Sequence, residues 1–237
     1  FKAEQALTRL VSIDYQVGRT GAVTPVANLE PVQLSGTIVK RASLHNADQM
    51  QFLDIHVGDY VYVEKGGEII PKITGVELSQ REPGVTLPHF PETCPDCGTP
   101  LVRDEQEAKA FCPNQSGCPT QIKGKLVHFL SRKAMNVIAG DATIDQLYNK
   151  GLVWNVADFY ELGKEHLLTL DGWKDRSAER FLKSLQDSKA TPFERVLYAL
   201  GIRHVGETTA KSLARHFGSI DVLMTAGKEQ LLGADDI

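Results

Sequence analysis

The segment Cys94-Pro95-Asp96-Cys97, followed after 14 residues by Cys112 and after five more by Cys118, decides how this chain is divided. It contains all four cysteines of the 237-residue sequence. Two thiolates two residues apart can curl round one cation, and a second pair completes the tetrahedron that zinc prefers. The spacing therefore predicts a closed, structural zinc site with no open position for a catalytic water. Two disulfides or four free thiols are the alternatives, but free thiols would leave so short a segment without a core.

The sequence before the cysteines is typical of a small β-barrel. Residues 12–17, 37–39 and 60–63 are β-branched or aromatic with period-two alternation, and glycine-rich turns separate them. About five short strands and one helical stretch near 46–53 predict an OB-fold barrel over residues 1–78. Residues 79–93, which contain three prolines, are predicted to be a linker.

The sequence after the cysteines has a helical period. Leu126, Phe129, Leu130 and Ala134 recur as one apolar face of a helix. A self-comparison finds three units with turns at positions 140, 174 and 206, spaced by 34 and 32 residues. Each unit has a turn and then a helix with a small residue in its first turns. The repeat predicts an all-α domain over residues 120–237, truncated at its C-terminus.

The repeated pattern, h-x-G-h-G-x-x-x-A, is that of a helix-hairpin-helix. Its glycines let the backbone approach a phosphate, and the second helix directs free amides at the same anion, so binding is independent of sequence. Every unit departs from the ideal: Ile138 replaces the first glycine of unit one, Lys174 the second of unit two, and His204 the first of unit three. Gly206 is expected to favour a positive φ. The predicted contacts are Gly172, Lys174, Arg176, Arg203, Gly206 and Lys211, with a helical bundle capped by ordinary glycines as the alternative.

The charge distribution places a polyanionic partner in the same part of the chain. Residues 1–119 hold 10 basic and 15 acidic side chains, whereas residues 120–216 hold 15 basic and 11 acidic ones. The seven histidines have no spacing typical of metal ligands, and they are interpreted as surface or packing residues. No apolar run of about 18 residues is present, so no membrane partner is expected.

The order of barrel, four-cysteine module and hairpins resembles the C-terminal half of bacterial NAD-dependent DNA ligases. Several segments carry the resemblance, namely Val17-Gly18-Arg19-Thr20-Gly21-Ala22-Val23-Thr24-Pro25-Val26-Ala27, Ser43-Leu44-His45-Asn46, Gly58-Asp59, Glu68-Ile69-Ile70-Pro71, His128-Phe129-Leu130-Ser131-Arg132-Lys133-Ala134-Met135-Asn136, Leu197-Tyr198-Ala199-Leu200-Gly201-Ile202-Arg203 and Val205-Gly206. The resemblance implies a multidomain protein: an OB-fold barrel over 1–78, a linker over 79–93, a four-cysteine zinc finger over 94–119 and helix-hairpin-helix units over 120–237. Its zinc ligands would be Cys94, Cys97, Cys112 and Cys118.

The resemblance also implies a function. The parent enzyme would seal 5′-phosphate/3′-hydroxyl nicks in duplex DNA during replication and repair, as a cytoplasmic monomer that uses NAD and Mg²⁺. Arg19 and Thr20, on an exposed turn of the barrel, would contact the minor groove near the nick, unless Arg19 is simply a solvated turn residue. The family's adenylation motif K-x-D-G does not occur in this sequence. The chain alone is therefore expected not to ligate. The alternative is a non-catalytic DNA-binding scaffold of a repair factor.

Overall fold

The computed structural model describes residues 4–65, 70–103 and 107–234 of the chain. The motif residues Glu68 and Ile69 lie outside these ranges. The chain forms two compact units, Phe1–Gln121 and Ile122–Ile237, each of which is described by itself.

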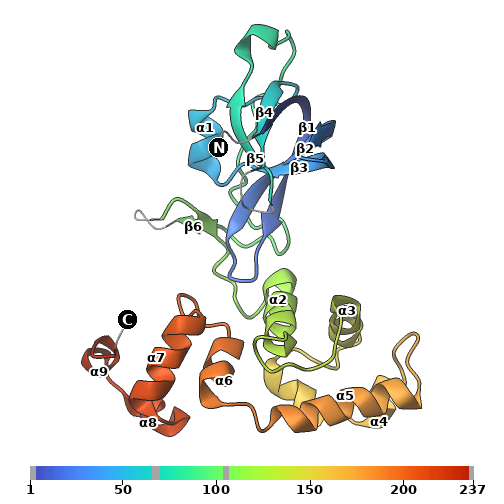
Figure 1. Ribbon diagram of the computed structural model, residues 1–237, viewed down its shortest axis with the longest axis vertical. Coiled ribbons are helices and arrows are strands. Elements are labelled where there is room, and N and C mark those ends of the chain that lie inside the picture. The colour runs from blue at the N-terminus through green and yellow to red at the C-terminus, as the bar shows by residue number, and fades with distance from the viewer. Residues whose placement is uncertain (1–3, 66–69, 104–106, 235–237) are drawn as a thin grey trace. The chain divides into compact units, whose positions relative to one another are not determined.

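The first unit is built on a closed five-stranded barrel (Figure 1), with strand order β1-β2-β3-β5-β4. The strands are β1 (Gln5–Val17), β2 (Val23–Leu34), β3 (Thr37–Ser43), β4 (Tyr60–Glu64) and β5 (Lys72–Val76). The long strand β1 pairs with β4 through its first half and with β2 through its second, and its register shifts between Leu10 and Ser12. An irregularity of this kind bends a strand, which lets one strand close the barrel from both sides.

The barrel encloses its own apolar core, as the alternation in the sequence predicts. Buried side chains include Leu10, Ala27, Leu29, Leu34, Val39, Leu44, Val61, Val63 and Ile73. Helix α1 (Ala47–Phe52) lies between β3 and β4 in the sequence, and the side chain of Asn46 accepts a hydrogen bond from the backbone N–H of Gln49 at 2.8 Å to begin it. The predicted OB-fold is confirmed.

Residues 79–93 are attached to the barrel and do not form a free tether. Helix η1 (Leu78–Gln80) begins this segment. Three contacts attach the residues that follow: Arg81 to Asp59 at 2.9 Å, Thr86 to Val57 by paired backbone hydrogen bonds, and the ring of Phe90 against that of Tyr15. The predicted domain limits stay predictions, but the linker lies on the barrel because its side chains complete buried and aromatic contacts there.

The cysteine-bearing segment follows in the same unit. Strands β6 (Val102–Arg103) and β7 (Ala110–Phe111) pair with each other, and an isolated bridge joins Phe111 to Ala22 of the barrel. The buried apolar atoms of the segment are mainly the cysteines themselves, packed with Val17 and Leu101. Such a small core cannot stabilise the segment without a further constraint.

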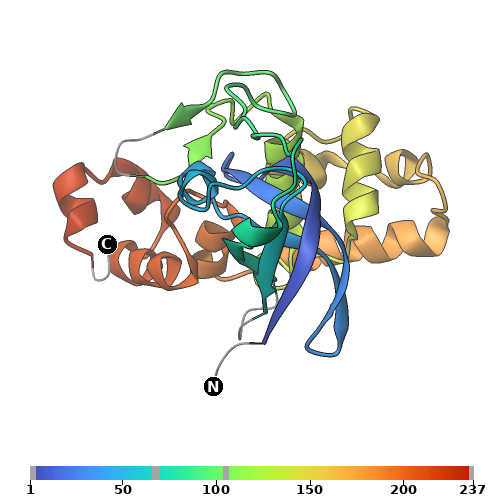
Figure 2. The same cartoon turned by 90° about the horizontal axis from the view of Figure 1, so that it is seen from above.

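The second unit consists of helices, drawn from yellow-green to red in Figures 1 and 2. They are α2 (Pro119–Leu130, whose first residues lie in the first unit), α3 (Asp141–Asn149), η2 (Val156–Glu161), α4 (Lys164–Leu167), α5 (Asp175–Ser188), α6 (Phe193–Ala199), α7 (Glu207–Phe217), α8 (Ile220–Thr225) and α9 (Lys228–Leu232). Phe129, Phe159 and Phe181 belong to its main core, and Leu213 and Phe217 to a smaller one. The apolar face predicted from Leu126 to Ala134 is buried, but α2 ends at Leu130, so Ala134 reaches the core from a turn.

Candidate metal centre and nucleic-acid interface

The four cysteine sulfurs converge on one point. All four Sγ atoms lie within 4.8 Å of one another, and those of Cys97 and Cys112 are 3.6 Å apart. Four thiolates at about 2.3 Å from a zinc ion stand roughly 3.8 Å from each other, so the donor set fits a tetrahedral zinc site. No disulfide joins these four cysteines, and 3.6 Å is far from the roughly 2.05 Å of a disulfide bond.

Polar neighbours surround the sulfurs. The hydroxyl of Thr99 lies 3.2 Å from Cys97 Sγ and lowers, together with the Thr99 backbone N–H, the pKa of Cys97 to about 6. Burial raises the pKa of Cys112 to about 11 and that of Cys118 to about 12. Four thiolates in this space repel one another, and a divalent cation is what would keep them all deprotonated. When bound, zinc would supply a structural cross-link, since four protein ligands leave no open position.

Two partners of the sulfurs were not predicted from the sequence. The side-chain amide of Asn114 lies 3.8 Å from Cys97 Sγ, and a carboxylate oxygen of Asp96 lies 3.5 Å from Cys118 Sγ. Asp96 also accepts a hydrogen bond from the backbone N–H of Thr120 at 2.8 Å. The sequence signal for these two partners was a polar residue between two cysteines of a pair, because residues that contact metal ligands orient those ligands.

Arg19 and Thr20 lie on the β1–β2 turn, as predicted, but the turn is not fully exposed. Both residues are half-buried, and Arg19 Nη1 is buried without a hydrogen-bond partner among the described residues. The prediction of an exposed turn was wrong, and the cysteine-bearing segment packs against the same turn at Gly21. This also disfavours the interpretation of Arg19 as a solvated arginine.

The second and third hairpins contain the same type of turn. Over residues 170–173 and 202–205, the first carbonyl accepts a hydrogen bond from the fourth N–H, at 3.1 and 3.0 Å. The third residue of each turn is left-handed, Gly172 at φ +79° and His204 at φ +67°. His204 thus takes the conformation for which the pattern uses glycine, although a side chain is unfavourable there. Units two and three of the inferred repeat therefore have the same backbone geometry at the turn.

The residues that begin the second helix of each hairpin are open to solvent. Lys174 precedes α5 and Gly206 precedes α7, both with extended backbone. Gly206 has φ −80°, so the expected positive φ was wrong there and belongs to His204. A Cβ built on Gly206 would meet no atom within 4 Å, so nothing within the described part of the chain requires glycine at this position. The predicted hairpin contacts are all exposed, namely Gly172, Lys174, Arg176, Arg203, Gly206 and Lys211.

Helices α5 and α7 each begin with an acidic residue, and lysine side chains form ion pairs with these residues. Asp175 lies 2.7 Å from Lys164, and Glu207 lies 3.4 Å from Lys133 and 3.6 Å from Lys211. Hydrogen bonds from Lys164 and Lys133 lower the pKa of the respective carboxyl groups, which stay ionised. Lys211 therefore has a carboxylate partner within its own helix. The pairing of Lys133 and Lys164 with these carboxylates was not predicted from the sequence.

The first unit of the repeat differs from the other two. Its left-handed residue is Asn136 at φ +55°, and the backbone N–H of Ile138 donates to Ser184 Oγ at 3.3 Å. Gly140 still begins α3 with φ −97° and open space around it. Unit one therefore lacks the turn seen in units two and three.

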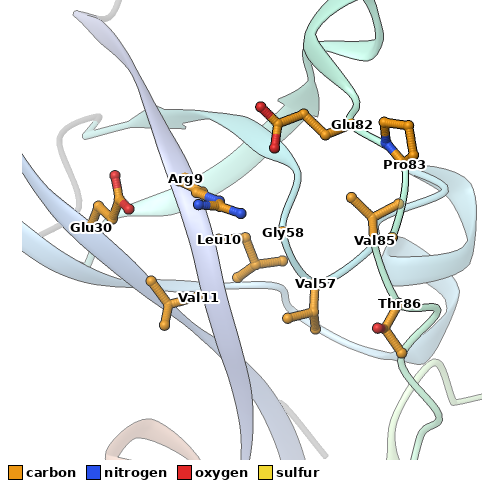
Figure 3. A pocket seen from close by; sticks show the side chains of 11 residues that line it. Arg9, Leu10, Val11, Glu30, Val57, Gly58, Glu82, Pro83, Val85 and Thr86 are labelled. Atoms are coloured by element: carbon orange, nitrogen blue, oxygen red, sulfur yellow. The ribbon is translucent and has the colours of Figure 1, made fainter.

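A pocket of about 390 Å³ lies on the barrel between β1 and residues 82–86 (Figure 3). In this view Arg9 stands between Glu30 and Glu82. None of the site residues inferred from the sequence lines it.

The closed barrel, the four-cysteine centre and the paired hairpins define a multidomain protein of OB-fold, zinc-finger and helix-hairpin-helix modules. The sequence model of the NAD-dependent DNA ligase OB-fold domain matches residues 7–85, and that of the NAD-dependent DNA ligase C4 zinc finger domain matches residues 93–119. A helix-hairpin-helix motif matches residues 195–237. The barrel and the zinc finger of this chain therefore belong to the NAD-dependent DNA ligase family, which confirms the resemblance.

Curated relatives match the chain from end to end. It is 57% identical over 238 residues to a DNA ligase of Parabacteroides distasonis and, over the same length, 57% identical to one of Bacteroides fragilis. A DNA ligase of Porphyromonas gingivalis is 54% identical over 237 residues. All of this chain aligns in each case, and it spans about 36% of the length of the first two relatives and 35% of the third. Within the described ranges, no helix combines the length and the apolarity needed to cross a membrane.

Proposed function

We propose that this chain is the DNA-holding region of an NAD-dependent DNA ligase that seals 5′-phosphate/3′-hydroxyl nicks in duplex DNA. The observation that carries the proposal is the match of its whole length to proteins named DNA ligase, through an OB-fold domain and a zinc finger of that family. Replication and repair in the cytoplasm, as a monomer, are part of the same proposal.

A ligase must bind DNA independently of its base sequence, because nicks occur in any sequence. In the proposed role, the hairpins at 170–174 and 202–206 present backbone amides and cationic side chains to phosphates. The open space around Gly206, directly after a turn that unit one lacks, leaves room for a phosphate to approach the backbone there. Arg19 and Thr20 would contact the minor groove on the barrel side.

The chemical steps require residues beyond this chain. In the proposed reaction, which would use Mg²⁺, a lysine of the K-x-D-G motif takes AMP from NAD and nicotinamide mononucleotide leaves. AMP then passes from the lysine to the 5′-phosphate, and attack of the 3′-hydroxyl on that phosphorus displaces AMP and seals the nick. The sequence contains no K-x-D-G. Incubated with NAD and nicked DNA, the chain is expected to form no covalent AMP adduct, as mass spectrometry would register. When an adenylated nucleotidyltransferase domain of a DNA ligase is fused before residue 1, sealing is expected; an adduct on Lys65 of the unfused chain would contradict the proposal.

Gly206→Val is expected to weaken duplex binding by about tenfold to a hundredfold while the fold is retained, because hydrogen bonds to a charged group contribute about 1.5–3 kcal/mol. The new side chain meets no internal atom but stands where a phosphate would approach. Fluorescence titration of a nicked duplex at several salt concentrations measures the loss, and affinity for both variant and parent should fall as salt rises.

Gly140→Val is the matched control, because Gly140 also begins a helix with negative φ and open space but lacks the shared turn. It should leave affinity nearly unchanged, and a duplex of scrambled sequence should bind the parent chain equally well. Equal affinity for Gly206→Val and the parent, with folding intact, would mean that the hairpins belong to an ordinary helical bundle in which the glycines only cap helices.

A further inference from the structure

One backbone segment serves both the zinc centre and the β1–β2 turn. Cys112 supplies a thiolate to the metal site, and its backbone N–H donates to the carbonyl of Gly21 at 2.9 Å. The adjacent pair, Phe111 and Ala22, forms an antiparallel bridge. Arg19 and Thr20 lie within this turn, which closes internally through a hydrogen bond from Gly21 N–H to the carbonyl of Gly18 at 2.9 Å.

Gly21 is a position that no other residue can fill without moving the zinc ligand. Its φ is +87°, and a Cβ there would lie 2.5 Å from the carbonyl oxygen of Cys112. A backbone atom at that distance cannot move aside as a flexible side chain can. The turn and the Cys112 backbone therefore pack in direct contact, and displacement of one displaces the other.

The side chain of Gln121 packs against both Cys112 and Gly21. Its side chain is fully buried, its amide nitrogen donates to the same Cys112 carbonyl at 3.1 Å, and its Oε1 lies 3.0 Å from the Cβ position of Gly21. Burial of a polar side chain is unfavourable unless it makes such a bond, so Gln121 fixes the Cys112 carbonyl in one orientation.

We propose that Gly21 and Gln121 are positioning residues that couple the zinc centre to the β1–β2 turn, so that metal occupancy sets the placement of Arg19 and Thr20. The coupling stands on the contacts of Cys112 alone; its consequence for DNA rests on the proposed function. By linkage the coupling is reciprocal, so an intact turn also raises the affinity of the cysteines for zinc.

Hydrogen exchange of the 237-residue chain, with zinc bound and after chelation, tests the coupling without a variant. Removal of zinc is expected to speed exchange of the amides of Gly18 and Gly21 by about tenfold or more, because they open together with the Cys112 contact. Amides in the β2–β3 pairing should keep their protection. Unchanged exchange at Gly18 and Gly21 on zinc removal would overturn the proposal.

Gly21→Ala and Gly36→Ala form a matched pair for the second arm. Gly36 has φ +73° in the β2–β3 turn, so its substitution introduces the same backbone strain, but a Cβ there meets no atom within 4 Å. Gly21→Ala is expected to release zinc to a chelator about 10–100-fold faster than Gly36→Ala does, the range found when outer partners of metal ligands are lost. Gln121→Met, which removes the amide donor at similar volume, should also release zinc faster. Equal release from the two glycine variants would contradict the coupling.

Titration of a nicked duplex separates the coupling from the proposed function. Faster zinc release with weaker duplex binding by Gly21→Ala supports both. Faster zinc release with unchanged duplex binding supports the coupling and removes Arg19 and Thr20 from the DNA interface.

Discussion

Replacement of Cys97 by serine is expected to abolish stoichiometric zinc binding and to unfold residues 94–118. Apparent binding free energies of structural zinc are about 10–16 kcal/mol at neutral pH, and this energy is the folding energy of a module with almost no core. Here the buried apolar side chains of the module are chiefly the cysteines. Atomic spectroscopy should find about one zinc per chain for the parent. Limited proteolysis should cut the variant within 94–118.

Thr99→Val provides the graded comparison for this prediction. It removes the hydroxyl 3.2 Å from Cys97 Sγ but no ligand, so zinc affinity should fall by about 10–100-fold without loss of the site. Acidification should release zinc from the parent as well, because protons compete for the thiolates. The barrel should survive in all cases, since its core is separate. Two disulfides and no metal in chain purified under reducing conditions would contradict the prediction.

The zinc site could be predicted because its information is local. Four cysteines within 25 residues, at spacings that one tetrahedron accommodates, leave few alternatives. The barrel could be predicted for a similar reason, since each strand has its own alternation of apolar and polar residues. The contact of Gly21 with Cys112 could not be predicted, because it joins residues 91 positions apart in sequence and leaves no periodic signal.

The second and third hairpins could be located from the sequence, but their conformation could not be predicted. The 32–34-residue spacing located them, yet His204 was interpreted as a departure from the pattern, while the backbone there is as left-handed as at Gly172. Neighbouring helices α6 and α7 hold the turn in place, so tertiary packing overrides the preference of histidine. Conversely, Gly206 was expected to need a special φ and does not.

The segment after the barrel was interpreted from composition alone. Its prolines predicted a linker, but one charged side chain, Arg81, reaches a carboxylate 22 positions earlier in the sequence. Prolines limit backbone conformation and say nothing about which side chains find buried partners. The contact of Arg81 leads to the second large effect expected of this chain.

Arg81→Met is expected to destabilise the barrel by about 3–5 kcal/mol, because removal of one partner leaves a buried charge without compensation. Asp59 is fully buried, and its two carboxylate oxygens accept hydrogen bonds from Arg81 Nε and Nη2, both at 2.9 Å. The backbone N–H of His56 donates to the same carboxylate at 2.7 Å. Asp59 and Asp54 both raise the pKa of Arg81, which is therefore charged at every pH at which the chain folds.

Arg41→Met is the matched control for Arg81→Met. Arg41 and Asp14 are 3.2 Å apart with side chains 48% and 57% exposed, so their pairing should contribute at most about 1 kcal/mol. Hydrogen exchange of core amides in β1 and β4 gives the free energy of opening of the barrel by itself. Combining Arg81→Met with Asp59→Leu should recover much of the loss, because the stranded carboxylate is removed with its partner. Equal losses for Arg81→Met and Arg41→Met would mean that Asp59 is stabilised by the barrel backbone alone, and that the segment after the barrel is held by its backbone and aromatic contacts.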